Sequence, residues 1–189
     1  CSGPEQAPQD ETLQVGILPD ESVASLRKRY IPLLDFLSNE TGLPYELVIP
    51  DSYEHLVKLF GEGRVNVAYF GGLTFVKANH EHDAVPLAMR DVDTRFTSAI
   101  VVADKSINNL QSLQGKRFSF GSRLSTSGHM MPRYFMQERY SVSPENFFHS
   151  VRYSGKHDRT VGKPVPGLCH YHLKRSARCS IAVDPKDGQ

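Results

Sequence analysis

Short apolar runs alternate with longer amphipathic stretches along most of the chain, and this alternation constrains the fold more than any other feature. Apolar residues at period two indicate strands, and apolar residues at helical period indicate helices. Strands are predicted over residues 13–18, 45–49, 65–70, 84–89, 96–102 and 117–120. Helices are predicted over residues 25–41, 52–61, 73–79 and 108–113, with a last one that ends near residue 140. This order favours an α/β fold with mainly parallel sheets flanked by helices.

The length of 189 residues suits one ordinary domain or two small lobes. A polar run around residues 90–95 separates two βα patterns, so we place a lobe boundary between residues 91 and 98. This boundary predicts a first lobe over residues 13–95 and a second lobe over residues 96–160. The formal net charge of +1 argues against nucleic acid as a partner. No apolar run approaches the roughly 20 residues that span a bilayer.

A serine-rich turn, Ser125-Thr126-Ser127-Gly128, joins the predicted strand at residues 117–120 to the helix that follows. A helix that starts in Ser and Thr exposes backbone N–H groups at the positive end of its dipole, and the hydroxyls add donors. The glycine lets a ligand oxygen approach the backbone. The turn therefore predicts an anion site. It has neither the Gly-Lys-Ser/Thr of a phosphate loop nor the Gly-x-Ser-x-Gly of a nucleophile elbow.

The chain begins with Cys1, which is followed by a polar stretch containing Pro and Gln up to residue 11. This start resembles a mature bacterial lipoprotein, in which the first cysteine carries acyl chains and the polar residues form a tether. We expect lipidation of Cys1, a tether over residues 1–12, and a membrane-anchored protein in the periplasm or at the cell surface. An arbitrary fragment start is the alternative.

Three sequence blocks follow this start in an order that resembles one known family. They are residues 29–78 (RYIPLLDFL to GGLTFVKA), residues 98–121 (SAIVVADKS to GKRFSFG) and residues 124–135 (LSTSGHMMPRYF). From about residue 13 to residue 160, the chain is similar to the phosphate-, phosphite- and phosphonate-binding proteins of ABC importers. The resemblance implies a bilobed periplasmic-binding-protein fold of type II.

The resemblance also implies a ligand site between the lobes. The serine-rich helix start, a first-lobe tyrosine at Tyr53 and a histidine at His157 match the family's motif, and Tyr69 ends its strand where it could line the cleft. Phe96 falls at an aromatic position that is often Tyr in phosphonate binders, and it has no hydroxyl. The predicted ligand-binding residues are Tyr53, Tyr69, Phe96, Ser125, Thr126, Ser127, Gly128 and His157.

The function implied by the resemblance is that of a lipid-anchored solute-binding component of an ABC importer. Such a protein captures phosphonate, phosphite or phosphate and delivers it to the permease, without chemistry on the ligand and without a cofactor. A ligand-sensing input domain of a signalling system on the same fold is the alternative. An enzyme acting on phosphoryl groups is a third hypothesis, but the sequence lacks the paired base, carboxylate cluster and phosphate-loop lysine that this chemistry needs.

Two clusters imitate metal-ligand sets. Residues 80–83 (His-Glu-His-Asp) follow a predicted helix, and this composition is typical of a solvated loop. Cys169, His170, His172 and Cys179 lie too close together for the usual paired zinc knuckles. We therefore predict no metal site.

The tail at residues 161–189 shows neither strand alternation nor a helical stripe, and basic residues are in excess there. The resembling family would continue with further strands of the second lobe and a return into the first. We expect a truncated or frameshifted sequence after about residue 160, an incomplete second lobe and a disordered tail. Because a half-built lobe cannot close around an anion, weak ligand binding or none is expected of this chain.

Overall fold

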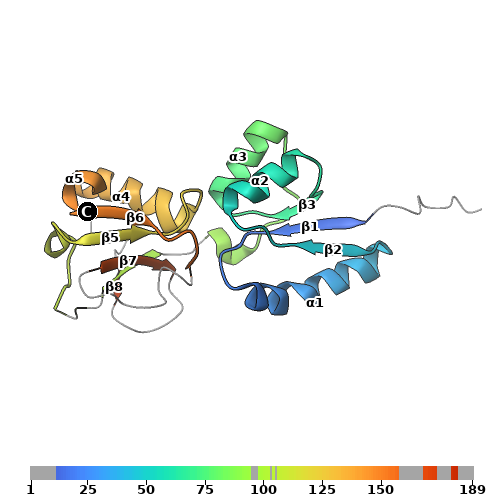
Figure 1. The fold of residues 1–189 in the computed structure, drawn as a ribbon, viewed down its shortest axis with the longest axis horizontal. Helices are drawn as coiled ribbons and strands as arrows, with labels where there is room; N and C mark the ends of the chain where they lie inside the picture. Colours follow the sequence, from blue (N-terminus) through green and yellow to red (C-terminus); the bar gives the residue numbers. More distant parts are fainter. Residues whose placement is uncertain are drawn as a thin grey trace, which may run out of the picture. The chain divides into compact units, whose positions relative to one another are not determined.

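The computed structural model describes residues 12–94, 98–102, 104, 106–157, 168–173 and 180–182. Its contacts divide the chain into two compact units, Cys1–Phe70 (unit 1) and Gly71–Gln189 (unit 2). Each unit holds its own β-sheet (Figure 1). Within the described ranges, no helix is both long enough and apolar enough to cross a membrane.

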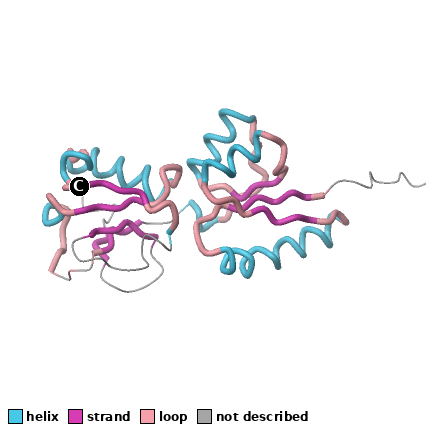
Figure 2. The backbone as a smooth tube through the Cα atoms, in the orientation of Figure 1, coloured by secondary structure: helices cyan, strands magenta, loops and turns pink. Residues whose placement is uncertain are grey.

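Unit 1 is a three-stranded parallel sheet with one helix on each face (Figure 2). Its elements are β1 (Leu13–Ile17), α1 (Val23–Thr41), β2 (Tyr45–Val48), α2 (Tyr53–Gly61) and β3 (Val67–Tyr69). The strand order is β2-β1-β3, so β1 lies in the middle and pairs with both neighbours. All five predicted elements of this unit are confirmed, because their apolar spacing is local to each segment.

The ends of the two helices are set by residues suited to helix capping. Ser22 Oγ accepts a hydrogen bond from Ser25 N–H at 3.3 Å, and Ser52 Oγ accepts one from His55 N–H at 3.1 Å. Both serines therefore satisfy a backbone donor in the first turn of a helix. Gly42 ends α1 with a φ of 72°, a left-handed conformation that glycine adopts without a steric penalty.

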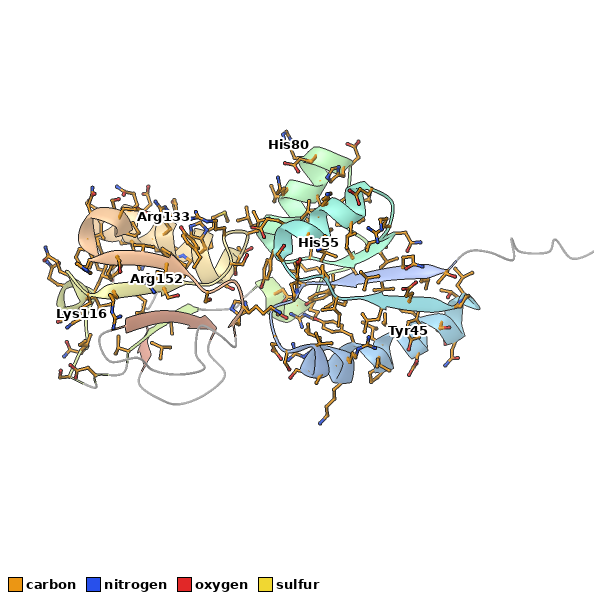
Figure 3. All side chains as sticks on the ribbon, viewed as in Figure 1. Tyr45, His55, His80, Lys116, Arg133 and Arg152 are labelled. Atoms are coloured by element: carbon orange, nitrogen blue, oxygen red, sulfur yellow. The ribbon has the colours of Figure 1, made fainter. Side chains whose placement is uncertain are left out.

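The central strand β1 contacts a different helix on each of its faces. On the α1 side, the core consists of Val15, Ile17, Leu26, Tyr30 and Leu34. Tyr45 of β2 points toward the same helix, where its hydroxyl donates to Asp35 Oδ1 at 2.7 Å (Figure 3). On the other face, a Cβ built on Gly16 would lie 2.4 Å from Leu56 Cδ1. The close approach of β1 to α2 therefore requires glycine at this position.

Unit 2 contains a mixed sheet of five strands in the order β6-β5-β7-β4-β8. Its described helices are α3 (Gly72–His82), α4 (Met131–Tyr140) and α5 (Pro144–Phe147), with 3₁₀ turns at Asp91–Thr94 and Gln111–Leu113 and a π-helical turn at Thr126–Met130. The strands are β4 (Ser98–Val101), β5 (Arg117–Phe120), β6 (Ser150–Tyr153), β7 (Leu168–Leu173) and β8 (Ser180–Ala182). β5 pairs in parallel with β6 and β7, whereas β4 pairs antiparallel with β7 and β8.

Aromatic rings from β5 lie at the centre of the core of unit 2. Phe118 stacks on Phe148 with 4.3 Å between ring centroids, and Phe120 meets Phe118 edge-on at 4.8 Å. Met136 of α4 is buried in the same cluster. The strand predicted at residues 117–120 is thus confirmed, and its buried rings fix the point at which the serine-rich turn begins.

Residues 84–89 do not form the predicted strand. The side chains of Val85 and Leu87 are 73% and 85% exposed. A strand needs a neighbour for its N–H and C=O groups, and none of the described strands pairs with this segment. Apolar alternation marks a segment that can pair, but it does not provide the partner.

The helix predicted over residues 108–113 is reduced to the 3₁₀ turn Gln111–Leu113. Asn109 Oδ1 accepts a hydrogen bond from Ser112 N–H at 2.9 Å. Such a local side-chain bond offers the backbone an alternative to the helix. Gly115, with a φ of 70°, then turns the chain into β5.

Within the tail predicted to be disordered, the structure describes two strands, β7 and β8. β7 pairs with β5 on one side and with β4 on the other. Without it, both of these strands would present unpaired backbone groups along an edge. The partners of β7 lie in distant parts of the chain, so its pairing cannot be predicted from the sequence of the tail alone.

The division between the two units falls earlier than the lobe boundary predicted between residues 91 and 98. α3 follows β3 directly in the chain, yet it belongs to unit 2. One bond that ties it there runs from Leu73 N–H to Thr126 Oγ1 at 2.7 Å. Local sequence patterns cannot show such a long-range bond, so the boundary predicted from them differs from the division in the structure.

Candidate functional site

The serine-rich turn is a capped helix start. Directly after β5, Gly121 N–H donates to Gly128 O at 2.8 Å and closes the loop between them. Ser125 Oγ then accepts from Gly128 N–H at 2.9 Å, as an N-cap side chain does. Ser125 and Ser127 are both buried, so the loop holds its hydroxyl groups within the fold of unit 2.

A π-helical turn leads from the serines into α4. Met130 N–H donates to Ser125 O at 3.0 Å, and Met131 N–H donates to Thr126 O. The wider turn places one more amide ahead of the first helical bond than an α-helix would. Pro132, which has no N–H, follows immediately at the start of α4. The backbone amides of the serine-rich turn thus gather at the positive end of a helix.

Gly128 is the point at which the loop, the cap and His157 meet. A Cβ built on Gly128 would lie 2.9 Å from Ser125 Oγ, 3.4 Å from Gly121 Cα and 3.4 Å from His157 Cε1. The turn is packed so closely at this position that only glycine fits. The prediction that glycine here admits a ligand oxygen stays a prediction.

His157 reaches the turn because the chain beyond β6 is bonded to the end of β5. Ser154 N–H and Ser154 Oγ both donate to Phe120 O, at 3.0 and 3.1 Å. Gly155 N–H donates to Gly121 O at 3.3 Å. The Nδ1 atom of His157 is buried. The structure therefore places the imidazole of His157 beside Gly128, and its contact with a ligand stays a prediction.

Thr126 differs from the two serines because its hydroxyl bonds to another helix. Its Oγ1 accepts from Leu73 N–H in the first turn of α3, at 2.7 Å. A hydroxyl has two lone pairs and one hydrogen, so this bond leaves the hydrogen available for donation. Thr126 can therefore donate to a ligand only along an O–H direction that leaves its bond from Leu73 N–H intact.

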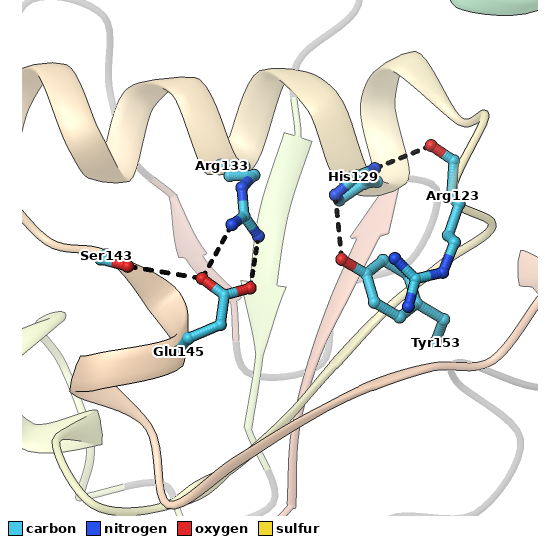
Figure 4. Close-up of polar contacts among 6 residues, drawn as sticks. All are labelled: Arg123, His129, Arg133, Ser143, Glu145 and Tyr153. Carbon is cyan, nitrogen blue, oxygen red and sulfur yellow. Dashed lines mark hydrogen bonds and ion pairs between the residues drawn. The ribbon is translucent and has the colours of Figure 1, made fainter.

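A second polar network supports the turn from the side of β6 (Figure 4). His129 Nδ1 lies 2.7 Å from Arg123 O and must donate, because a carbonyl oxygen only accepts. His129 Nε2 is then free to accept from the hydroxyl of Tyr153 at 3.1 Å, which assigns a neutral ring from the network. The guanidinium of Arg123 lies over the Tyr153 ring, 3.9 Å from its centroid.

The lowered pKa of His129 predicts a stability that depends on pH. Burial is the main cause, and the positive charges of Arg133 and Arg123 add to it, against the bond to the Arg123 carbonyl. Because its pKa is lowered, His129 is protonated less readily in the folded protein than in the unfolded chain. Neutral His129 therefore contributes its full stability above the ordinary pKa of 6.5. This contribution is lost as the pH falls through 6.5 and then through the lower pKa of His129 in the folded protein.

The substitution His129→Asn keeps a donor for Arg123 and does not titrate. We expect its unfolding free energy, measured in urea, to vary less than that of the wild type between about pH 8 and about pH 5. His55→Asn is the matched control, because His55 forms an exposed pair with Asp51 that contributes little. Equal acid sensitivity of the wild type and His129→Asn would exclude His129 as the source.

Three further candidates have different outcomes. Tyr53 is the first residue of α2 and is 4% exposed, and burial raises its pKa, with smaller contributions from Asp20 and Glu54. Tyr69 packs its ring 5.2 Å from that of Tyr30 and lies against the α1-side core, and its contact with a ligand stays a prediction. Phe96 lies outside the described residues, as does Cys1.

Sequence patterns did not point to Asp20, whose pKa shifts more than that of any other carboxyl group described in unit 1. It follows β1 directly after Pro19, and burial raises its pKa from 3.8 to about 6, with Glu21 adding to the effect and Arg29 opposing it. Ligands of open α/β sheets lie beyond the carboxyl ends of parallel strands. The position of Asp20 at such an end was the signal that could have found it.

No group of three or more His, Cys, Asp or Glu side chains in the described part of the chain is arranged to hold a metal ion. In residues 80–83, Glu81 instead pairs with Lys77 one helical turn away. The side chains of Cys169, His170 and His172 are not among those described, and Cys179 lies outside the described residues.

Comparison with known proteins gives a family match over most of the chain. Residues 15–163 match the family described as ABC transporter, phosphonate, periplasmic substrate-binding protein. A probable ABC transporter phosphite-binding protein of Prochlorococcus marinus is 31% identical over 160 residues, which cover 80% of this chain and 54% of that protein. A phosphonates-binding periplasmic protein of Escherichia coli is 26% identical over 151 residues, covering 76% of this chain and 45% of that one.

A solved structure is similar over most of the chain. It is the Prochlorococcus marinus protein PhnD1 in complex with methylphosphonate, which superposes with a TM-score of 0.77 at 30% identity. The match covers 86% of this chain and 63% of that one. The chain spans about half the length of the curated relatives that it matches.

Proposed function

The chain belongs to the periplasmic substrate-binding proteins of phosphonate ABC transporters, and we propose that it captures a phosphorus oxyanion for delivery to an ABC permease. Its fold is that of the type II periplasmic binding proteins. The observation that carries the proposal is the capped helix start at Ser125, Ser127 and Gly128, with His157 packed beside it.

This arrangement suits a small anion with several oxygens. Backbone N–H groups at the start of a helix attract negative charge, and the serine hydroxyls add donors that point from the same loop. The imidazole of His157 supplies a donor from a second segment. Hydrogen bonds to a charged ligand are the stronger kind, so a few of them suffice for specific capture.

The class of ligand in this proposal is phosphonate, phosphite or phosphate. The two relatives are named for phosphite and for phosphonates, so they support the class and leave the choice open within it. Capture by hydrogen bonds alone requires no nucleophile or base, which agrees with a transport role rather than catalysis. The serine-rich turn is built within unit 2, so we expect at least weak binding by the chain as it stands.

The direct test is an NMR titration with methylphosphonate, phosphite and phosphate, because shifts of assigned amides report weak as well as tight binding. We expect Ser127→Ala to lose a donor and to weaken binding by about 1 to 3 kcal/mol, the range for a hydrogen bond to a charged group. Ser143→Ala is the matched control, since Ser143 also precedes a helix of unit 2. Unchanged affinity in Ser127→Ala would place the anion elsewhere.

Anchoring through acyl chains on Cys1 is part of the same proposal. The support for it is the Cys1-Ser2-Gly3 start and the polar stretch that follows. Palmitate should label the protein when it is made in a bacterial cell, and Cys1→Ala should abolish the labelling. Equal labelling of both proteins would refute the anchor without affecting the ligand site.

A further inference from the structure

The first turn of α3 lacks a capping side chain of its own. Its N-cap is Gly71, which has no side chain to accept from the amides of the first turn. Thr74 Oγ1 bonds to the N–H and the C=O of Gly71, both at 2.8 Å, and so turns back on the N-cap. The amide of Leu73, at the second helical position, is one of the two amides that an N-cap side chain can serve.

Thr126 serves that amide from 53 positions away in the chain, with 2.7 Å between Leu73 N and Thr126 Oγ1. The contact also depends on the residue before Leu73. A Cβ built on Gly72 would lie 3.1 Å from Thr126 Oγ1 and 3.6 Å from its Cγ2. Because Gly72 has no side chain, the start of α3 and the start of the π-helical turn meet at one hydroxyl.

We propose that Thr126 couples anion binding at the serine-rich turn to the capping of α3, with its hydroxyl accepting from Leu73 and donating its hydrogen to the bound oxyanion. A hydroxyl that donates to an anion becomes a better acceptor, because hydrogen bonds in a chain polarise one another. The bond from Leu73 likewise makes the hydroxyl a better donor. The coupling is reciprocal, so each partner strengthens the other. This inference rests on the proposed function.

The coupling makes Gly72 a positioning residue, although it carries no group that could bind the ligand. The substitution Gly72→Ala should push Thr126 away from its present position and weaken methylphosphonate binding several-fold. Thr126→Val keeps the shape of the side chain and removes the hydroxyl, so it should lose both bonds. Thr126→Ser keeps the hydroxyl and should behave nearly as the wild type.

Hydrogen exchange at the Leu73 amide, measured by NMR, gives a readout that a merely structural role of Gly72 would not change. In the wild type and in Thr126→Ser, saturating methylphosphonate should slow this exchange several-fold, and in Thr126→Val it should not. The amide of Gly115, which bonds to Phe147 O at 2.8 Å, should exchange equally with and without ligand.

Two results would overturn the coupling in different ways. Methylphosphonate shifts at the serine-rich turn, together with unchanged Leu73 exchange and unchanged affinity in Gly72→Ala, would refute the coupling and leave the proposed function in place. Absence of any shift at the turn with methylphosphonate, phosphite and phosphate would refute the proposed function and the coupling together.

Discussion

We expect Gly128→Val to abolish measurable binding of methylphosphonate at the serine-rich turn, and Gly128→Ala to weaken it by an intermediate amount. A Cβ at this position would lie 2.9 Å from Ser125 Oγ, which is the atom that caps Gly128 N–H. The added methyl groups of valine must also displace Gly121 or His157, both within 3.4 Å of that Cβ. Loss of two or more charge-assisted hydrogen bonds corresponds to about 100-fold or more in affinity.

NMR titration of the wild type and both variants measures this effect. Gly61→Val is the control, because Gly61 is the exposed last residue of α2 in unit 1. The dispersion of the remaining resonances and the urea midpoint show whether each variant is folded. If a folded Gly128→Val binds methylphosphonate as tightly as the wild type, the anion is not held at this turn.

The second large effect is a gain in stability from Asp20→Asn. Raising the pKa of Asp20 from 3.8 to about 6 corresponds to about 3 kcal/mol against the ionised form in the folded protein. Part of this comes from Glu21, but the first cause is burial, which asparagine tolerates because it carries no charge. At about pH 8 we expect the free energy of unfolding of Asp20→Asn to exceed that of the wild type by about 2 to 3 kcal/mol.

The pH dependence of this gain follows from the direction of the pKa shift. The folded protein holds the proton of Asp20 more readily than the unfolded chain, so the cost of ionisation is absent below the ordinary value of 3.8, grows as the pH rises through about 6, and is complete above it. Urea unfolding of the two proteins at several pH values tests this. Glu46→Gln, an exposed change on β2, should show no such trend. Equal stability of wild type and Asp20→Asn at high pH would contradict the claim that ionisation of Asp20 costs stability.

A partly buried carboxylate that costs stability is typical of a residue kept for function. Asp20 lies where ligands of parallel sheets bind, beyond the end of β1. The single substitution Asp20→Asn would make the protein more stable, so stability alone does not explain an aspartate at this position.

Local patterns predicted the elements of unit 1 well. The spacing of Leu26, Tyr30 and Leu34 is that of one helix face, and Ser22 and Gly42 are residues suited to the start and the end of that helix. Each signal lies within the segment that it describes. For that reason β1, α1, β2, α2 and β3 could be read from the sequence without knowledge of their neighbours.

Elements that depend on distant partners could not be predicted in this way. Residues 84–89 have the alternation of a strand, but no described strand pairs with them. β7 (Leu168–Leu173) was assigned to a disordered tail, yet it fills the place between β4 and β5. Strand formation is decided by pairing as well as by propensity, and pairing is a property of the whole sheet.

The candidate site likewise has features that the local sequence predicts and features that depend on distant residues. Capping chemistry alone identified the helix start at Ser125, and the family resemblance added His157, which the fold places beside Gly128. The bond from Leu73 to Thr126 could not be foreseen, because a backbone amide leaves no signal in the sequence. The same holds for the close packing at Gly128, which involves atoms of its own loop and of the distant His157.

The most direct test of the account is the titration of the wild-type chain with methylphosphonate, followed through the amide resonances of Thr126, Ser127, Gly128 and His129 and the imidazole resonances of His157. The account predicts saturable shifts at these groups that decrease in Ser127→Ala and disappear in Gly128→Val. Saturable shifts confined to other residues, or none at the turn of a folded protein with methylphosphonate, phosphite or phosphate, would contradict it.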